Sequence, residues 1–243
     1  FAQLIETEKP DVTLAMATSA ARDVTNGEAL FALGEKYKIP IEIIPGHLEA
    51  KITYDGATYD RKNKIGVAAI DVGGGSTEVI ALGENGEPQG VSVDVGSVRL
   101  TEMFVTGHPI QIAEVNQIKE YAVKKFFESK DQLPQASLTE IIGVAGTPTT
   151  LAAVMQGAPY SDELVHGYKI STNDLNTWIN KLAAMDLKSR QEVVGMDPKR
   201  ADVIVAGMCI LLAALEALNK SELVVSIRGV RYGVAIHAAK MSR

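Results

Sequence analysis

A glycine-rich run between two carboxylates is the part of the sequence best suited to chemistry. It reads Ile70-Asp71-Val72-Gly73-Gly74-Gly75-Ser76-Thr77-Glu78. Glycines let backbone N–H groups approach an anion closely, and the Ser76 hydroxyl adds a further donor. We therefore predict that Gly73, Gly74, Gly75 and Ser76 bind phosphate, and the alternative is a plain tight β-turn without a ligand.

Two better-known phosphate loops do not fit this run. A Rossmann loop needs a helix directly after the glycines. Here residues 77–82 read as a strand that ends at Asn85-Gly86, which is a strong hairpin signal. A P-loop needs a Lys before its Ser or Thr, and no Lys stands at that place. What remains is a strand–turn–strand hairpin with phosphate at its turn.

Asp71 and Glu78 stand on either side of this turn. Residues that flank a short hairpin turn face each other across the two strands. Two carboxylates beside a phosphate site make sense mainly when a cation lies between them, and Mg²⁺ prefers one or two carboxylates together with waters and phosphates. We predict Asp71 and Glu78 as ligands of Mg²⁺ or another divalent cation, and the alternative is that they are surface charges at strand ends.

A second glycine turn, residues 143–147, lies between an expected strand and an expected helix. Gly146 and Thr147 would present backbone N–H groups at the N-terminus of that helix, where anions bind readily. We predict that both residues bind the substrate, and the alternative is a helix cap without a ligand.

Two further residues follow expected strands. Arg22, in Ala17-Thr18-Ser19-Ala20-Ala21-Arg22, suits phosphate capture one turn after a strand. A capped helix with a surface arginine is nearly as good an interpretation. Glu49, just after the strand at 40–44, could deprotonate an attacking water, although exposed glutamates are common on helices.

Alternating strands and helices at the start of the chain predict a parallel α/β layer, which is followed by an antiparallel meander of three strands and a mainly helical remainder. The expected strands are 12–17, 40–44, 65–71, 77–82, 91–95, 141–144 and 223–226. The expected helices are 1–8, 20–37, 46–55, 110–127, 146–155, a long apolar helix opened by Asp197-Pro198, and a last helix after Gly229. The polar stretch 59–64 is a domain boundary or a solvated loop.

Composition limits the class of protein. The chain has 243 residues, 46% of them hydrophobic, with a net charge of −6 and one cysteine. These values indicate a globular chain of one or two domains and exclude a disulfide framework. The negative charge argues against binding of a nucleic acid polymer or a membrane surface, and no apolar run is long enough to span a membrane. Cytoplasm is the expected compartment.

Several blocks together resemble the exopolyphosphatase / guanosine pentaphosphate phosphatase (Ppx/GppA) family. The resemblance covers nearly the whole chain, apart from an N-terminal hairpin that we expect to be missing from this sequence. The blocks are 17–22, 43–50, 71–78, 96–102, 143–147, 166–168, 200–202, 206–207 and 226–231.

The resemblance implies an actin/Hsp70-like, ribonuclease H-type α/β fold of two domains. Residues 1–62 would be the remainder of the first domain and 63–243 the second. In the family pattern Glu49 is the catalytic base, Asp71 and Glu78 are the metal-associated carboxylates, and Gly73–Ser76 bind phosphate through the backbone. Arg22 matches a phosphate-contacting arginine.

The activity implied is Mg²⁺-dependent release of terminal phosphate from polyphosphate or guanosine pentaphosphate, with a homodimer as an expected assembly. A non-catalytic sensor of a nucleotide alarmone that uses the same loops is the alternative. An ATPase or sugar kinase of the same superfamily fits less well, because a carboxylate base placed before the glycine hairpin suits hydrolysis of a phosphate chain.

Overall fold

A mixed six-stranded sheet is the centre of the computed structural model, which describes residues 1–18, 27–134 and 137–241. The strand order is β5-β4-β3-β6-β8-β7. The strands are β3 (Val67–Val72), β4 (Thr77–Leu82), β5 (Pro88–Val93), β6 (Glu140–Val144), β7 (Lys169–Ser171) and β8 (Glu222–Val225). The predicted meander is confirmed, because β3, β4 and β5 pair antiparallel, whereas β6 and β8 continue the sheet parallel to β3.

Both faces of the sheet are covered, and β3 shows how. Successive side chains of a strand point to opposite faces. Ala68, Ile70 and Val72 belong to the larger core, whereas Val67 and Ala69 belong to a smaller core under a single helix. The next residue on the face of Val67 and Ala69 is Asp71, so the pleat brings a carboxylate to the end of that smaller core.

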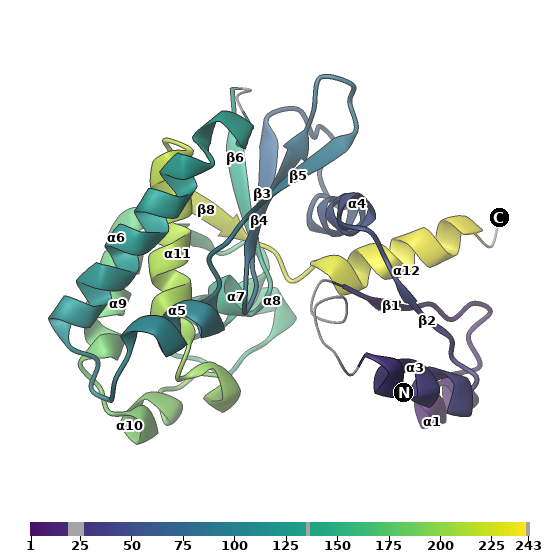
Figure 1. Cartoon of the computed structure of the whole chain (residues 1–243), viewed down its shortest axis with the longest axis horizontal. Coiled ribbons are helices and arrows are strands. Elements are labelled where there is room, and N and C mark those ends of the chain that lie inside the picture. Colours follow the sequence, from purple (N-terminus) through teal and green to yellow (C-terminus); the bar gives the residue numbers. More distant parts are fainter. Residues whose placement is uncertain (19–26, 135–136, 242–243) are drawn as a thin grey trace.

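Helices α5, α6, α9 and α11 lie on one side of the sheet (Figure 1). The bounds on this side and at its lower end are α5 (Ser97–Phe104), α6 (Ile112–Glu128), α7 (Gly146–Gln156), α8 (Asp162–Val165), α9 (Thr172–Ala183), α10 (Leu187–Gln191) and α11 (Ile204–Ala217). Helix α11 is buried on nearly every side, as expected for a helix surrounded by protein. Among the described residues, no helix combines the length and the apolar character that crossing a membrane requires.

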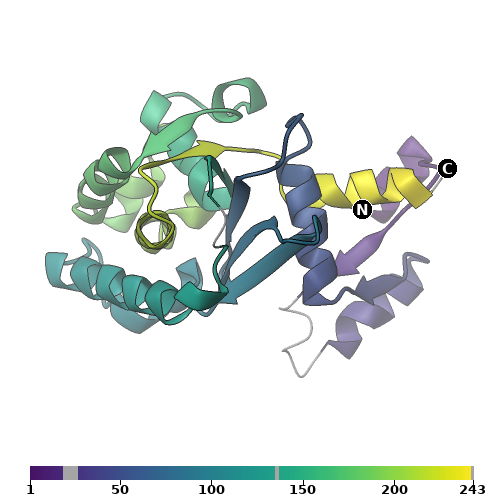
Figure 2. The ribbon, with the colours of Figure 1, turned by 90° about the horizontal axis from the view of Figure 1, so that it is seen from above.

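The other side of the sheet carries α4 (Gly46–Ala57), which packs against the C-terminal helix α12 (Val230–Met241). Beyond them lies a small parallel sheet of β1 (Ala15–Ala17) and β2 (Ile41–Ile43), with α1 (Ala2–Glu8) and α3 (Glu28–Lys36) (Figures 1 and 2). The first and last parts of the chain are therefore neighbours. The division into 1–62 and 63–243 stays a prediction.

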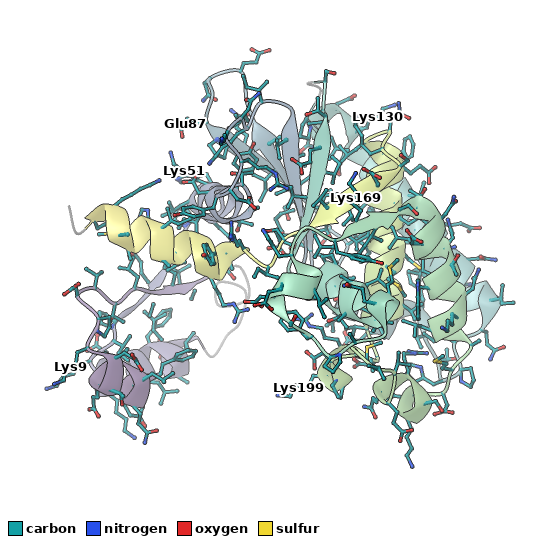
Figure 3. The ribbon with its side chains drawn as sticks, turned by 180° about the vertical axis from the view of Figure 1, so that it is seen from behind. Lys9, Lys51, Glu87, Lys130, Lys169 and Lys199 are labelled. Carbon is teal, nitrogen blue, oxygen red and sulfur yellow. The ribbon has the colours of Figure 1, made fainter. Side chains whose placement is uncertain are left out.

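Helix α4 is held on the sheet by polar contacts as well as by packing. The buried Tyr54 hydroxyl lies 3.0 Å from the Lys64 carbonyl oxygen and 3.1 Å from that of Val67, to which it can donate. Lys51 forms an ion pair with Glu87 at the β4–β5 turn (Figure 3). These contacts hold the middle and the last part of α4 on the sheet, and the helix carries Glu49 in its first turn.

Several elements differ from the expectation, among them the strands expected at 12–17 and 91–95, which the structure has at Ala15–Ala17 and Pro88–Val93. The short helix α5 and the three-residue strand β7 were not predicted, because each is too short to show a periodic pattern. Pro198 begins a separate 3₁₀ turn, Pro198–Arg200, and the long apolar helix starts only at Ile204. The predicted start of that helix at Pro198 is therefore wrong by six residues. Residues 20–26 of the helix expected at 20–37 lie outside the described residues, and the rest of it is α3 (Glu28–Lys36).

Replacing Gly90 with valine is expected to lift α4 from the sheet. A Cβ at Gly90 would lie 2.8 Å from the Ala50 Cβ, closer than packed carbons approach. Overpacking of this kind costs about 1–3 kcal/mol, which urea unfolding would measure. Gly107→Val is the matched control, since a Cβ at Gly107 would have nothing within 4 Å. Equal stabilities of the two variants would contradict the close approach.

Candidate active site

Asp71, Glu78 and Ser92 form a row across three neighbouring strands. Asp71 of β3 is the direct partner of Glu78 of β4, and Glu78 is the direct partner of Ser92 of β5. All three residues share the face that α4 covers, because Ala69 and Ile80 on the same face pack into the core beneath that helix. The predicted opposition of Asp71 and Glu78 across the hairpin is confirmed.

Glu49 of the covering helix α4 faces the same cavity as this row. It lies in the first turn of α4 and lines, with Asp71, Ser76, Glu78 and Ser92, a cavity of about 150 Å³. At about 30 Å³ of liquid volume per water, this cavity has room for a few water molecules. Sequence reasoning could only guess that Glu49 faces the glycine hairpin, and the structure brings the two together.

Two hydroxyl groups meet at one oxygen of Glu78. Ser76 Oγ donates to Glu78 Oε1 at 2.7 Å, and Ser92 Oγ donates to the same oxygen at 3.0 Å. The Ser76 hydroxyl proton is therefore directed to a carboxylate. In this arrangement Ser76 can offer phosphate its backbone N–H rather than its side chain.

The glycine turn is braced by the N-terminus of α5. The carbonyl oxygen of Gly73 accepts from Ser97 N at 2.9 Å, and that of Gly74 accepts from Val98 N and Arg99 N, both at 3.0 Å. Gly96 makes this possible, because a Cβ there would lie 2.2 Å from the Gly74 carbonyl oxygen. With its carbonyls held by the helix, the turn keeps one orientation.

Not all amides of the turn are equally available. The Gly73 N–H donates to the Ser76 carbonyl oxygen at 3.0 Å and closes the turn. Within the part of the chain that the structure describes, the N–H groups of Gly74 and Gly75 have no protein acceptor. Gly74 and Gly75 are exposed, so their amides are the better placed donors for an anion.

A second and larger cavity, of about 920 Å³, also reaches Asp71. The N-terminus of α7 forms one wall of it through Ala145 and Gly146, and Ala145 as the helix N-cap has a positive φ of 67°. Thr149, Thr150, Tyr160, Arg200 and Arg231 also line it. Asp71 is thus shared between a small polar cavity and a cavity of substrate size.

Arg200 is a site residue that sequence reasoning missed. Its guanidinium lies directly on Gly146, where a Cβ would be 1.8 Å from Arg200 Cζ. Arg200 Nε lies 3.6 Å from Asp197 Oδ2, and this ion pair spans the 3₁₀ turn. Arg200 belongs to the block 200–202 that supported the family resemblance, but nothing in its spacing indicated that it meets the α7 N-terminus. It brings a cation into the larger cavity.

The electrostatics of Asp71 are unusual for an aspartate. Burial of its carboxyl raises its pKa, the nearby charges of Glu78 and Glu49 raise it further, and Arg200 opposes them. The resulting pKa is about 7. A cation between the carboxylates would relieve this repulsion, and such perturbed acids gather at functional sites.

In buffer without divalent cations, Asp71→Asn is expected to stabilise the protein at pH 8 and to leave it unchanged at pH 4. A folded-state pKa of about 7, against 3.8 as the ordinary value, means that folding favours the protonated carboxyl. That contribution is complete below about pH 4 and is lost as the pH rises through 7, by at most about 4 kcal/mol. Urea unfolding at both pH values measures it.

The exposed Asp131 supplies the control for this experiment. Asp131→Asn should change the free energy of unfolding equally little at pH 4 and pH 8. If Asp71→Asn behaves in the same way, burial of the carboxyl and the charges of Glu78 and Glu49 do not raise the pKa of Asp71 as the geometry indicates.

Two predicted residues lie differently from the others. The Thr147 side chain is buried, and its Oγ1 would lie 2.5 Å from a Cβ at Gly207 of α11, so it faces the core while Thr149 and Thr150 line the cavity. Its capping alternative is not observed either, since Ala145 is the N-cap. Arg22 lies outside the described residues. The binding roles of both residues stay predictions.

The structure does not itself test the prediction that Asp71 and Glu78 bind Mg²⁺. The two carboxylates are nevertheless suitable ligands. Within the described ranges, no group of three or more His, Cys, Asp or Glu residues is arranged to hold a metal ion. Asp71 and Glu78 as a pair match the one or two carboxylates that Mg²⁺ takes when waters and phosphate oxygens complete its shell. Mg²⁺ at this place stays a prediction.

Comparison with known proteins gives one consistent family. The family model described as the Ppx/GppA phosphatase family matches residues 1–241. The bifunctional 3-dehydroquinate synthase/phosphatase of Fusobacterium nucleatum is 33% identical over 219 residues, which are 88% of this chain and 32% of that protein. Exopolyphosphatase 2 of Mycobacterium tuberculosis is 30% identical over 255 residues, covering 98% of this chain and 78% of that protein.

Solved structures agree with this result. The Aquifex aeolicus member of the Ppx/GppA family has a TM-score of 0.85 at 29% identity, covering 100% of this chain and 78% of that one. An exopolyphosphatase from Cytophaga hutchinsonii has a TM-score of 0.83 at 26% identity, covering 97% and 77%. These likenesses confirm the predicted actin-like, ribonuclease H-type α/β fold.

The fold and the family comparison together define a hydrolytic enzyme of the actin-like class. Within that class, the chain belongs to the Ppx/GppA phosphatase family. The predicted family resemblance is therefore confirmed.

Proposed function

We propose that this chain releases the terminal phosphate from inorganic polyphosphate or from guanosine pentaphosphate. The observation that carries the proposal is the convergence of Glu49, Asp71 and Glu78 on one small cavity, with Asp71 also reaching a cavity of substrate size. Relatives named exopolyphosphatase 2 and guanosine-5'-triphosphate,3'-diphosphate pyrophosphatase support the substrate classes.

In the proposed reaction, Glu49 takes a proton from a water molecule in the small cavity. The water oxygen attacks the terminal phosphorus, and the bond from that phosphorus to the bridging oxygen breaks. Charge on the phosphoryl oxygens would be stabilised by the N–H groups of Gly74 and Gly75, by the N-terminus of α7 at Gly146 and by the Arg200 guanidinium.

Asp71 and Glu78 would hold Mg²⁺, directly or through water. Bound Mg²⁺ would supply positive charge to the phosphate oxygens. Asp71 and Glu78 themselves would keep carboxylate oxygens beside the glycine turn. The raised pKa of Asp71 is consistent with a site that needs a cation.

Phosphate release from linear polyphosphate and from guanosine pentaphosphate, with Mg²⁺ or with EDTA, tests the proposal. We expect release with Mg²⁺ from at least one of the two substrates and loss of release with EDTA. Calorimetry on the same samples separates an enzyme from a sensor, because binding of either substrate without release would overturn the proposed activity.

A further inference from the structure

Ser92 has no role in the chemistry described so far, yet it stands beside the proposed cation site. It lies on the edge strand β5, directly opposite Glu78. Its hydroxyl donates to Glu78 Oε1 at 3.0 Å and lines the small cavity. Ser92 is exposed, so this bond is not a by-product of core packing.

Only one of the two carboxylate oxygens of Glu78 accepts hydrogen bonds from the two serines. Both serines donate to Oε1. Ser76 lies two residues before Glu78 in the chain, whereas Ser92 lies opposite it on the neighbouring strand β5. Among the described residues, no hydrogen bond to Oε2 is formed. A carboxylate whose first oxygen is held by two donors keeps a fixed plane, and its second oxygen stays available for a ligand.

The hydroxyl groups themselves favour a cation at this point. Because each serine uses its one hydroxyl proton in the hydrogen bond to Glu78, the oxygen atoms of both hydroxyls turn lone pairs to their surroundings. Lone pairs suit a hydrated cation and repel phosphate. The arrangement therefore separates the cation side of the hairpin from the amides of Gly74 and Gly75 on its anion side.

We propose that Ser92 is a positioning residue, which holds the Glu78 carboxylate so that one of its oxygens faces the divalent cation. This inference rests on the proposed function for the identity of the reaction. Partners of metal ligands in other proteins change metal affinity or activity by about 10–100-fold when they are removed. Ser92 would act through Glu78 without touching the substrate.

Ser92→Thr and Ser92→Val form a matched pair of variants, because their side chains have the same shape and differ in the hydroxyl. Both are β-branched and suit an edge strand. With Mn²⁺ as the probe, calorimetry should give the threonine variant a Kd close to that of the natural chain, and the valine variant a Kd about tenfold weaker.

Phosphate release provides a second readout. The valine variant should need more Mg²⁺ for half-maximal activity and should have a lower kcat, while its KM for polyphosphate stays unchanged. Ser189→Ala is the control, since Ser189 Oγ donates to the Asp186 carboxylate at 2.8 Å outside the site. This variant should keep the natural Mn²⁺ affinity and kcat.

The outcomes separate the inference from the function on which it rests. If the natural chain binds Mn²⁺ but releases no phosphate, the proposed function fails, while the Mn²⁺ affinities still decide the role of Ser92. Equal Mn²⁺ affinities of the threonine and valine variants, or no Mn²⁺ binding by the natural chain, would overturn the inference about Ser92.

Discussion

Replacing Glu49 with glutamine is expected to reduce phosphate release by about a hundredfold or more, while polyphosphate still binds. Glutamine has the shape of glutamate and keeps its place in the first turn of α4, but it cannot accept a proton from water. The cavity that Glu49 shares with Asp71 and Glu78 should keep its size. Initial rates of phosphate release measure the loss, and calorimetry with polyphosphate measures binding.

Glu42→Gln provides the control for this experiment. Glu42 is an exposed residue of β2, and its replacement removes the same charge from the same part of the chain. Its rate of phosphate release should equal that of the natural chain. Unchanged turnover in Glu49→Gln would remove Glu49 from the mechanism and leave the origin of the attacking hydroxide unexplained.

Replacing Arg190 with methionine is expected to destabilise the fold by about 3 kcal/mol or more, because each buried acceptor that loses its donor costs about 1–3 kcal/mol. The Arg190 side chain is fully buried, and its guanidinium donates to the carbonyl oxygens of Leu182 at 2.9 Å, Met185 at 3.1 Å and Ala201 at 2.9 Å. Methionine fills similar space but leaves all three acceptors without this donor. Urea unfolding measures the change.

Arg190→Met should also loosen the position of Arg200 in the larger cavity. Ala201 directly follows Arg200, so loss of its hydrogen bond frees the turn that places Arg200 on Gly146. Lys188→Met, on the exposed face of the same short helix α10, is the control and should change stability little. A loss below about 1 kcal/mol in Arg190→Met would mean that water replaces the missing donors.

Much of the hairpin could be predicted from sequence because its information is local. Residues on either side of a short turn must face each other, so the pairing of Asp71 with Glu78 followed from their spacing alone. The strand β4 was predicted with the bounds that the structure has, since Asn85-Gly86 marks its end. The N-terminus of α7 beside Gly146 followed from a glycine turn between a strand and a helix.

The rest of the site depends on contacts between distant parts of the chain. Ser92 meets Glu78 through strand register, and Arg200 meets Gly146 because a buried arginine anchors the turn that carries it. Neither residue belongs to a local pattern of hydrophobic periodicity or glycine spacing. For Thr147 the local pattern concerned only the backbone N–H, so it could not show that packing against Gly207 turns the side chain to the core.

The packing of α12 on α4 has a consequence for how the protein is made. A Cβ at Gly233 of α12 would lie 1.8 Å from the Ile52 carbonyl oxygen, so the two helices are in direct backbone contact. Helix α4 carries Glu49, whereas α12 is translated last among the described elements. A nascent chain from which α12 has not yet emerged therefore lacks the backbone contact that holds α4, and with it Glu49, in place.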